Sequence, residues 1–368
     1  MDFYGYMRPN GKAGARNYVL LLPVNRSLNF IASNVERMTR NTHHFEIPAE
    51  TGRTEVDREV IARTLIGLMN NANVGGIVLL AVKSGAGSAY KNMCAERFEE
   101  EARKTGKPFR IVYLTNVGGS YNMLGETLRL TREVLLEVSD FRRENCPLSA
   151  LTLGVKCGTS DATSGIAGNP CVGAAFDQLI RAGGTAFFSE TTEIIGAEDL
   201  VAKRAVNESV AKKILSAARH WEDKAKATGE DIRKINPIPA NIAAGISSLE
   251  EKSLGAIAKS GTSPIQDVLK YAEMPKGSGL YFVDSWMSSL SLPLCLTACG
   301  ATIMLYQMGG GKIAQHPMMP SINPTVVSPF LYLTGNAIAY SRAPDNFDFD
   351  ASPIICLLYT SPSPRDCS

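Results

Sequence analysis

Short apolar runs alternate with amphipathic segments along the first half of the chain. The runs lie at residues 18–24, 75–82 and 110–114. Each has the length of a strand and lacks polar alternation, which is typical of strands buried on both faces of a parallel sheet. Between them, apolar residues recur at helical spacing, as in segment 57–72, where Ile61, Leu65 and Leu68 share one face. The alternation predicts an α/β domain over residues 1–145.

The same alternation begins again after Cys146 and Pro147. Apolar runs of strand length occur at residues 151–155, 185–188, 280–283 and 301–306, with helical patterns between them. We therefore predict a second α/β domain over residues 146–352. The fold class expected for the whole chain is two Rossmann-like α/β domains with mostly parallel sheets.

The last segment, residues 353–368, has no periodicity. Its string PIICLLYTSPSPRDCS resembles translated sequencing-adapter read-through, so we interpret it as a non-native tail on a truncated carboxyl terminus. We expect residues from about Pro353 to pack against nothing and to form no regular element. Apolar surface of the second domain would then be left uncovered.

Composition and charge exclude several classes of protein. With 38 Lys and Arg against 36 Asp and Glu, the formal net charge is +2, and no basic stripe indicates nucleic-acid binding. No apolar run approaches the roughly 20 residues of a membrane-spanning helix, and residues 1–18 lack the apolar core of a signal peptide. The eight cysteines match no zinc or disulfide framework. We therefore expect a cytoplasmic protein with reduced thiols.

A segment rich in small and polar residues follows the predicted strand 151–155. It contains Cys157, Gly158, Ser160, Asp161, Ser164 and Asn169. Open α/β sheets bind ligands at the carboxyl ends of their strands, glycines allow close backbone approach, and a helix N-terminus offers free N–H groups to an anion. The alternative is a capped turn, with Asn169 as the N-cap and Pro170 as the first helical residue. We favour the ligand-binding loop.

Two further segments carry candidate acid–base groups. Ser189 and Glu190 follow the predicted strand 185–188, where a desolvated carboxylate can act as a general base or a metal ligand. Lys252 and Lys259 lie seven residues apart on one face of a predicted helix. A lysine there could clamp a carboxylate or act as a base if desolvated. The alternative for both is a solvated lysine on an amphipathic helix.

Other features give weaker signals. His44 and His316 have no metal-site spacing, although folding could bring them together. Residues 85–87 match only part of the dinucleotide-binding fingerprint. A nucleotide-dependent Rossmann oxidoreductase is therefore disfavoured.

Five ordered segments resemble signature blocks of the altronate/galactarate dehydratase family. They span residues 5–18, 153–170, 183–198, 235–245 and 251–261. The family contains sugar-acid dehydratases and the large subunit of sulfolactate sulfo-lyase. The resemblance implies a carbon–oxygen lyase that removes the proton α to a carboxylate and expels the β-hydroxyl as water. The implied product from altronate or galactarate is a 2-keto-3-deoxy acid.

The resemblance also implies roles for particular residues. Glu190 or Lys252 is the implied base, and Ser160 or Asp161 lies near the leaving group. Lys252 or Arg16 would bind the substrate carboxylate. Further substrate contacts are expected from Asn17, Gly158, Ser164, Asn169 and Ser189. The implied cofactor is a divalent metal, Fe²⁺, with Cys157 as a thiolate ligand and His44 as a second candidate.

Departures from the family pattern keep alternatives open. No cysteine follows His44 closely, and Lys83 and Ser84 stand where relatives often carry a glycine and a cysteine. A related lyase acting on a sulfolactate-like 2-hydroxy acid, or a catalytically inactive regulatory or scaffold subunit, would also fit. The first block begins at Gly5, so we expect a separate small subunit in place of the family's N-terminal domain. A homo-oligomer is compatible with the same observations.

Overall fold

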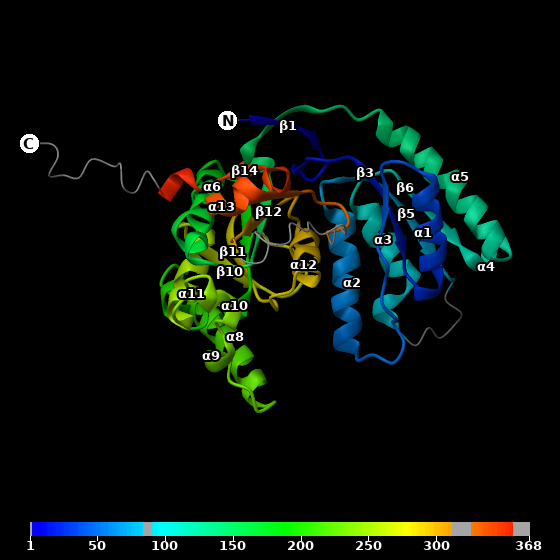
Figure 1. The fold of residues 1–368 in the computed structure, drawn as a ribbon. Helices are drawn as coiled ribbons and strands as arrows, with labels where there is room; N and C mark the ends of the chain where they lie inside the picture. The colour runs from blue at the N-terminus through cyan, green and yellow to red at the C-terminus, as the bar shows by residue number, and fades with distance from the viewer. Residues whose placement is uncertain (1, 84–89, 311–324, 356–368) are drawn as a thin grey trace, which may run out of the picture.

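The computed structural model describes residues 2–83, 90–310 and 325–355, and its framework is two parallel sheets, one in each half of the chain (Figure 1). The first sheet has the strand order β4-β3-β5-β6. Its strands are β3 (Tyr18–Pro23), β4 (Thr42–His44), β5 (Val74–Ala81) and β6 (Phe109–Tyr113). The accompanying helices are α1 (Asn29–Met38), α2 (Glu55–Asn70), α3 (Ala95–Lys104), α4 (Leu114–Val117) and α5 (Ser120–Ser139).

Helices cover both faces of this first sheet. Successive residues of a strand point to opposite faces, so Leu20 and Leu22 pack in the core shared with α2 and α3. Val19 and Leu21 pack in the core shared with α1 and α5. Because both faces are buried, β3 has no position for a polar side chain, which explains the unbroken apolar run in the sequence.

The second sheet has seven parallel strands in the order β10-β11-β9-β8-β12-β13-β14. The strands are β8 (Thr152–Gly158), β9 (Thr185–Phe188), β10 (Ile265–Leu269), β11 (Gly279–Val283), β12 (Ile303–Met308), β13 (Phe330–Thr334) and β14 (Phe349–Asp350). The helices are α6 (Asn169–Arg181), α7 (Glu198–Ala202), α8 (Glu208–Lys226), α9 (Ile232–Ile235), α10 (Pro239–Ala243), α11 (Leu249–Ile257), α12 (Ser291–Cys299) and α13 (Ala337–Arg342). Among the described helices, none has the length and apolarity to cross a membrane. The two parallel sheets confirm the predicted α/β fold class.

The second sheet is also covered on both faces. Phe188 and Phe282 pack with residues of α6 and α8 on one face. Phe187 and Tyr281 pack with residues of α12 on the other face. This arrangement leaves the carboxyl ends of the strands as the place where polar side chains can gather.

A small antiparallel sheet joins the start of the chain to the passage between the two halves. β1 (Asp2–Met7) pairs with β2 (Ala13–Gly14) and with β7 (Glu144–Pro147). The predicted boundary between residues 145 and 146 falls inside β7, where Cys146 is buried.

The two halves meet where α2 packs against α12 (Figure 1). The backbones approach so closely that a Cβ atom on Gly67 would lie 2.2 Å from the carbonyl oxygen of Ala298. The Asn71 side chain donates to the carbonyl oxygens of Thr297 at 2.9 Å and Ala301 at 2.8 Å. A side-chain amide thus satisfies buried carbonyl groups of the other domain.

The end of the described chain departs from expectation. Residues 353–355 form a helical turn, and Ile354 packs against the core of the second domain. The prediction that nothing from Pro353 onward packs or forms a regular element is therefore wrong for this turn. The other tail residues, 356–368, lie outside the described residues, as do the 85–87 segment and His316.

Candidate functional site

Two loops bring the first group of polar side chains together. β8 and β9 pair in parallel, so their carboxyl ends lie at the same edge of the sheet. Cys157 is the penultimate residue of β8, and Glu190 lies two residues beyond β9. Glu190 has a φ of 73°, in the left-handed region that non-glycine residues rarely adopt. Such a conformation costs about 1–3 kcal/mol and tends to occur at functional sites.

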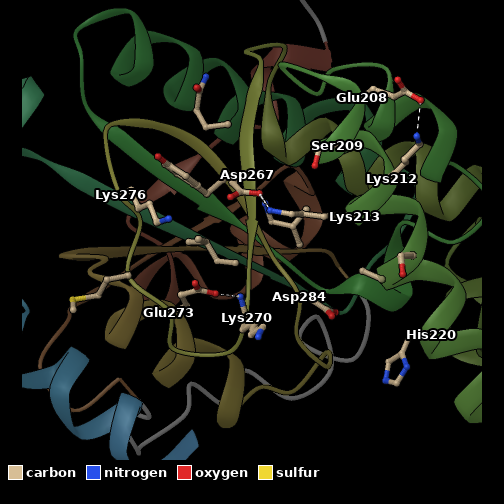
Figure 2. Close-up of a pocket in the computed structure, with 17 residues that line it drawn as sticks. Glu208, Ser209, Lys212, Lys213, His220, Asp267, Lys270, Glu273, Lys276 and Asp284 are labelled. Atoms are coloured by element: carbon tan, nitrogen blue, oxygen red, sulfur yellow. Dashed lines mark hydrogen bonds and ion pairs between the residues drawn. The ribbon is translucent and has the colours of Figure 1, made fainter. Parts of the chain in front are cut away.

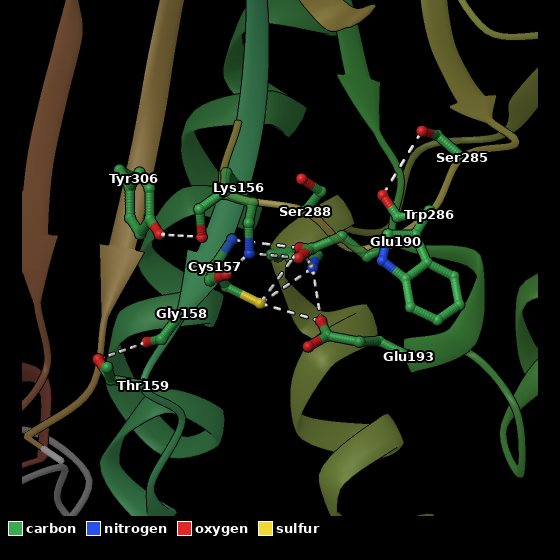
Figure 3. A network of polar contacts seen from close by, with 12 residues as sticks. Lys156, Cys157, Gly158, Thr159, Glu190, Glu193, Ser285, Trp286, Ser288 and Tyr306 are labelled. Atoms are coloured by element: carbon green, nitrogen blue, oxygen red, sulfur yellow. Dashed lines mark hydrogen bonds and ion pairs between the residues drawn. The ribbon is translucent and has the colours of Figure 1, made fainter. Parts of the chain in front are cut away.

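The Glu190 carboxylate accepts hydrogen bonds on both oxygens in a fully buried position (Figure 3). Lys156 Nζ lies 2.6 Å from Oε1. The Cys157 backbone N–H and thiol donate to Oε2 at 3.2 and 3.4 Å. Lys259 Nζ also donates to Oε2. Buried charges of this kind are tolerated only when paired and hydrogen-bonded.

Glu193 completes this group, which we call the Cys157 cluster: Lys156, Cys157, Glu190, Glu193 and Lys259. Glu193 ends the 3-10 turn Thr191–Glu193. Its Oε2 accepts from the Cys157 thiol at 3.0 Å and from Lys259 Nζ at 3.0 Å. Within the described parts of the chain, no hydrogen bond reaches its Oε1.

The charged groups of the Cys157 cluster shift one another's pKa values. Burial raises the pKa of the Cys157 thiol well above its ordinary value, and Glu190 and Glu193 raise it further, so the thiol is neutral. Desolvation by burial opposes the charge on Lys259, but the carboxylates of Glu190 and Glu193 hold the pKa of its ammonium well above the ordinary value. Burial likewise opposes ionisation of Glu193, but Lys259 and Lys156 bring its pKa down to about 2. The cluster therefore holds the ammonium ions of Lys156 and Lys259 and an ionised Glu193 around a neutral thiol.

Three members of the cluster offer the donor atoms of a metal site. One donor atom each from Cys157, Glu190 and Glu193 lies within 4.8 Å of the others, and all three residues are buried. A thiol and two carboxylates suit a borderline divalent ion. However, Lys259 Nζ lies 3.0 Å from Cys157 Sγ and contacts both carboxylates. In this arrangement the three side chains do not fit a divalent ion, because an ammonium already takes its place.

A pocket of about 320 Å³ lies between the loop after β8, the start of α6 and α11. Five residues expected at the site from the sequence line this pocket: Ser160, Asp161, Ser164, Asn169 and Lys252. The charge of Lys252 also lowers the pKa of Glu193, after Lys259 and Lys156, so the pocket and the Cys157 cluster are electrostatic neighbours.

Lys252 is buried without a carboxylate partner among the described residues. Its Nζ donates to the amide oxygens of Asn236 at 2.7 Å and Asn241 at 3.2 Å. Asn241 is fixed in turn by donating to the carbonyl oxygen of Ser160 at 3.0 Å. Two neutral amides orient the ammonium but do not cancel its charge. An anion entering the pocket could therefore form a direct ion pair with Lys252, which no carboxylate among the described residues does.

Asn169 presents an unsatisfied acceptor to the same pocket. It is the first residue of α6 and has helical dihedrals, so the alternative that it is the N-cap is wrong. Its Nδ2 donates to the carbonyl oxygen of Gly255 at 2.8 Å. Its Oδ1 is buried and has no hydrogen-bond partner in the part of the chain that the structure describes. A buried orphan acceptor is costly unless a ligand or water supplies a donor.

The Asp161 carboxylate accepts hydrogen bonds from residues of three loops. Its Oδ1 accepts from the backbone N–H of Ser164 at 3.0 Å. Its Oδ2 accepts from the backbone N–H of Gly310 at 2.6 Å and from Asn336 Nδ2 at 2.8 Å. These bonds tie together the loops after β8, β12 and β13. Asp161 therefore holds the wall of the pocket in shape.

Two other residues expected at the site, Ser189 and Gly158, make contacts between the ends of neighbouring strands. The Ser189 hydroxyl donates to the carbonyl oxygen of Val283 at 2.6 Å, which joins the ends of β9 and β11. Gly158 allows Tyr306 to approach, since a Cβ atom there would lie 2.9 Å from its hydroxyl oxygen. Neither residue lines the pocket.

The remaining three expected residues lie in the first domain, away from this pocket. Arg16 and Asn17 precede β3 and so stand at the amino end of a strand. Asn17 accepts from Arg8 at 2.9 Å and donates to the carbonyl oxygen of Val138 at 2.9 Å. His44 ends β4 and hydrogen-bonds Glu36. The structure thus groups Cys157 with two glutamates and does not group it with His44.

A larger groove, of about 1200 Å³, lies between α8 and the loop that joins β10 to β11 (Figure 2). Its charged side chains pair with each other, as Lys213 does with Asp267 at 2.6 Å and Lys212 with Glu208 at 2.7 Å. These pairs are exposed and contribute little. No residue expected at the site from the sequence lines this groove.

The structure adds Lys156, Asn236 and Asn241 to the residues expected from the sequence, and it brings Glu193 and Lys259 into the Cys157 cluster. Glu193 and Lys259 belonged to segments that were recognised, but position alone did not separate them from solvated charges. Lys156 occupies an apolar strand, and a charge inside such a strand is a signal that could have been used.

Comparison with known proteins places these features in a family. The family described as D-galactarate/altronate dehydratase, C-terminal, matches residues 148–360. The second domain of D-galactarate dehydratase/altronate hydrolase matches residues 5–139.

Individual relatives agree with these matches. The chain is 33% identical to (2R)-sulfolactate sulfo-lyase subunit beta of Chromohalobacter salexigens, over 96% of this chain and 87% of that protein. It is 32% identical to altronate dehydratase of Bacillus subtilis, over 84% of this chain and 62% of that protein. It is 31% identical to galactarate dehydratase (L-threo-forming) of Escherichia coli, with the same shares, 84% and 62%. The chain spans less than two thirds of each of these dehydratases. It belongs to the D-galactarate/altronate dehydratase family, whose named members here are carbon–oxygen and carbon–sulfur lyases.

Proposed function

We propose that the protein removes water from a hydroxylated sugar acid such as altronate or galactarate and yields a 2-keto-3-deoxy acid. Two relatives are named for these substrates. The pocket supports the proposal because its polar groups match the two functional groups of such a molecule, a carboxylate and a chain of hydroxyls.

The buried ammonium of Lys252 carries the argument. Among the described residues its partners are amide oxygens, so a substrate carboxylate would be its first directly contacting anion and would gain a charge-assisted hydrogen bond. Asn169 Oδ1, buried and unpaired, would accept a hydrogen bond from a substrate hydroxyl. A ligand with both groups satisfies both demands of the pocket.

The elimination needs a base, a leaving-group donor and a positive charge. The base removes the α-proton and the electron pair forms an enediolate. The β carbon–oxygen bond then breaks, the hydroxide leaves as water with a proton from the donor, and the resulting enol takes up a proton at C3 to give the 2-keto acid. In our proposal Lys252 stabilises the enediolate, and Ser160 supplies a hydroxyl beside the leaving group. Glu190 has both oxygens engaged, and in our proposal it holds the Cys157 cluster in place beside the pocket.

The Fe²⁺ implied by the family resemblance enters none of these steps. The only group of donors of the metal-binding type among the described residues surrounds Lys259. The proposed roles therefore rest on the chain's own side chains.

A second candidate is elimination from sulfolactate or a similar 2-hydroxy acid. The chain covers 87% of the sulfo-lyase subunit, against 62% of each dehydratase. A carboxylate and a hydroxyl are common to both substrate classes, so the pocket accepts either. Because that relative is named as a subunit, we also propose that a separate small subunit contributes to activity. Full activity of the purified chain alone would contradict this.

The deciding experiment is a substrate screen. Aldonic acids, aldaric acids and (2R)-sulfolactate are incubated with the protein, with and without Fe²⁺ and with its small-subunit partner where one is found. Formation of a 2-keto-3-deoxy acid supports the dehydratase, and release of sulfite supports the alternative. Absence of both products under every condition would favour the inactive scaffold.

The variant Lys252→Met tests whether the buried ammonium of Lys252 binds the substrate and stabilises the enediolate. We expect KM to rise at least about 10-fold and kcat to fall about 100-fold, since the carboxylate and the enediolate lose their cation. Lys252→Arg should recover part of the loss in KM. Lys213→Met, which removes a paired lysine in the groove of Figure 2, should change neither constant. Equal kinetics for Lys252→Met and Lys213→Met would refute the role.

A further inference from the structure

The side chain of Lys259 fills the centre of the Cys157 cluster. The sequence spacing predicted only that it lies on one face of a helix. We propose that Lys259 is the resident cation of the Cys157–Glu190–Glu193 group and keeps divalent metal out of it. The inference rests on the cluster alone and does not depend on the identity of the substrate.

The contacts of Lys259 match those of an ion in a three-ligand site. Its Nζ lies 3.0 Å from Cys157 Sγ, 3.0 Å from Glu193 Oε2 and within hydrogen-bond distance of Glu190 Oε2. These are the residues whose donor atoms lie within 4.8 Å of one another. An ammonium has three N–H donors, and each has one acceptor here. The side chain is 2% exposed, so no solvent shares the position.

The backbone around Lys259 holds it there. Lys259 lies in the 3-10 turn Ala258–Ser260 at the end of α11. This turn packs on α6 so tightly that a Cβ atom on Gly173 would lie 2.2 Å from the carbonyl oxygen of Ala258. Arg204 Nη1 donates to the Ser260 hydroxyl at 2.8 Å. A fixed turn leaves the lysine little freedom to withdraw in favour of another cation.

Charge balance favours the same conclusion. Lys156 and Lys259 offset Glu190 and Glu193 in a buried space. A divalent ion added to this set would introduce two uncompensated positive charges at low effective dielectric, which is strongly unfavourable. Without the Lys259 charge, the two carboxylates and the thiol would have one cation fewer, and a metal ion could meet all three.

Lys156 provides the matched control. It pairs with Glu190 Oε1 at 2.6 Å, and no described bond joins it to Cys157 Sγ or to Glu193. Replacing Lys156 removes the same charge from the cluster but leaves Lys259 at the centre. Only a loss of Lys259 should open the three donor atoms to a metal.

The test compares wild type, Lys259→Met, Lys156→Met and the double variant Lys259→Met/Cys157→Ser after removal of metal with a chelator. Each protein is titrated with Co²⁺, whose thiolate charge-transfer absorbance reports a cobalt–sulfur bond, and bound cobalt is counted after dialysis. We expect Lys259→Met to bind one Co²⁺ per chain with this absorbance, at least about 100-fold more tightly than wild type or Lys156→Met. The double variant should lose the absorbance.

Two outcomes would overturn the proposal. One is a wild-type protein that shows the thiolate absorbance with one equivalent of Co²⁺ per chain, and this arm needs no variant to fold. The other is a Lys259→Met protein that has a wild-type circular dichroism spectrum and binds no Co²⁺. Lys259→Gln, which keeps a hydrogen-bond donor without the charge, replaces Lys259→Met if the latter does not fold, and the same expectation applies to it.

Discussion

Lys252 and Lys259 lie seven residues apart in one segment and meet opposite surroundings. Lys252 donates to two neutral amide oxygens, whereas Lys259 is enclosed by two carboxylates and a thiol. The Lys252 ammonium can therefore still pair directly with a ligand, whereas the Lys259 ammonium is already paired within the protein. Burial alone would not distinguish them, since both are buried.

Stability in acid should report the charge on Glu193. Its pKa is held at about 2 in the fold, against an ordinary value of 4.5, because Lys259 and Lys156 outweigh the effect of burial. A depressed pKa stabilises the fold above the ordinary value, and this stability is lost as the pH falls from 4.5 towards 2. In urea unfolding between about pH 6 and about pH 3, Glu193→Gln should therefore show a smaller decline in unfolding free energy than wild type.

The slope, and not the absolute stability, is the quantity to compare, because Glu193→Gln also leaves Lys259 with one carboxylate fewer. Glu230→Gln, at an exposed position, serves as the control and should follow the wild-type slope. Parallel curves for Glu193→Gln and wild type would contradict the buried charge pairing.

At the scale of elements, the contact of α2 with α12 depends on a glycine. The Ala298 carbonyl oxygen occupies the place of a Cβ atom on Gly67. Helices approach this closely only where one of them has no side chain, so Gly67 sets the distance between the two domains.

Gly67→Ala should lower the free energy of unfolding by about 1–3 kcal/mol or more, because backbone atoms must move apart. Gly125→Ala is the matched control, since Gly125 is also within a helix, α5, and a Cβ atom there meets nothing within 4 Å. It should raise the unfolding free energy by about 0.5–1 kcal/mol through helix propensity. The urea midpoints of the two variants should move in opposite directions, and a shared direction would show that α2 and α12 are not in close contact.

For the whole molecule, buried polar contacts connect the domains as well as apolar packing. Asn71 bonds two carbonyl oxygens around α12, and Asn73 Nδ2 donates to the carbonyl oxygen of Thr302 at 2.7 Å. Both asparagines are buried. Carbonyl groups that lose such partners stay buried and unsatisfied, at about 1–3 kcal/mol each.

We expect the described domains to unfold in one calorimetric transition, and Asn71→Ala to separate it into two. Asn70→Ala is the control, because the Asn70 side chain donates to the Ile66 carbonyl oxygen of its own helix at 2.9 Å. Two transitions in the wild-type protein would show that the interface does not couple the domains.

The sequence by itself determined the fold class and the two loops that carry the site. Apolar runs without polar alternation predicted the parallel sheets, and segment 57–72 predicted α2, observed at Glu55–Asn70. Polar residues directly after the strand 151–155 predicted a ligand-binding loop, and four of them, Ser160, Asp161, Ser164 and Asn169, line one pocket. The fold class could be predicted because strand periodicity is a local property of the chain.

Only the tertiary structure decided which of the candidate residues meet. Strand order is set by packing between distant segments, and it placed β9 beside β8 and so brought Glu190 to Cys157. The same packing left Arg16, Asn17 and His44 in the first domain, although they stood in equally polar segments. The burial of Lys259 among Cys157, Glu190 and Glu193 arises from three separate elements: β8, the turn after β9 and the 3-10 turn after α11. A sequence pattern records the type of each residue, but partners and dielectric surroundings exist only once those elements pack together.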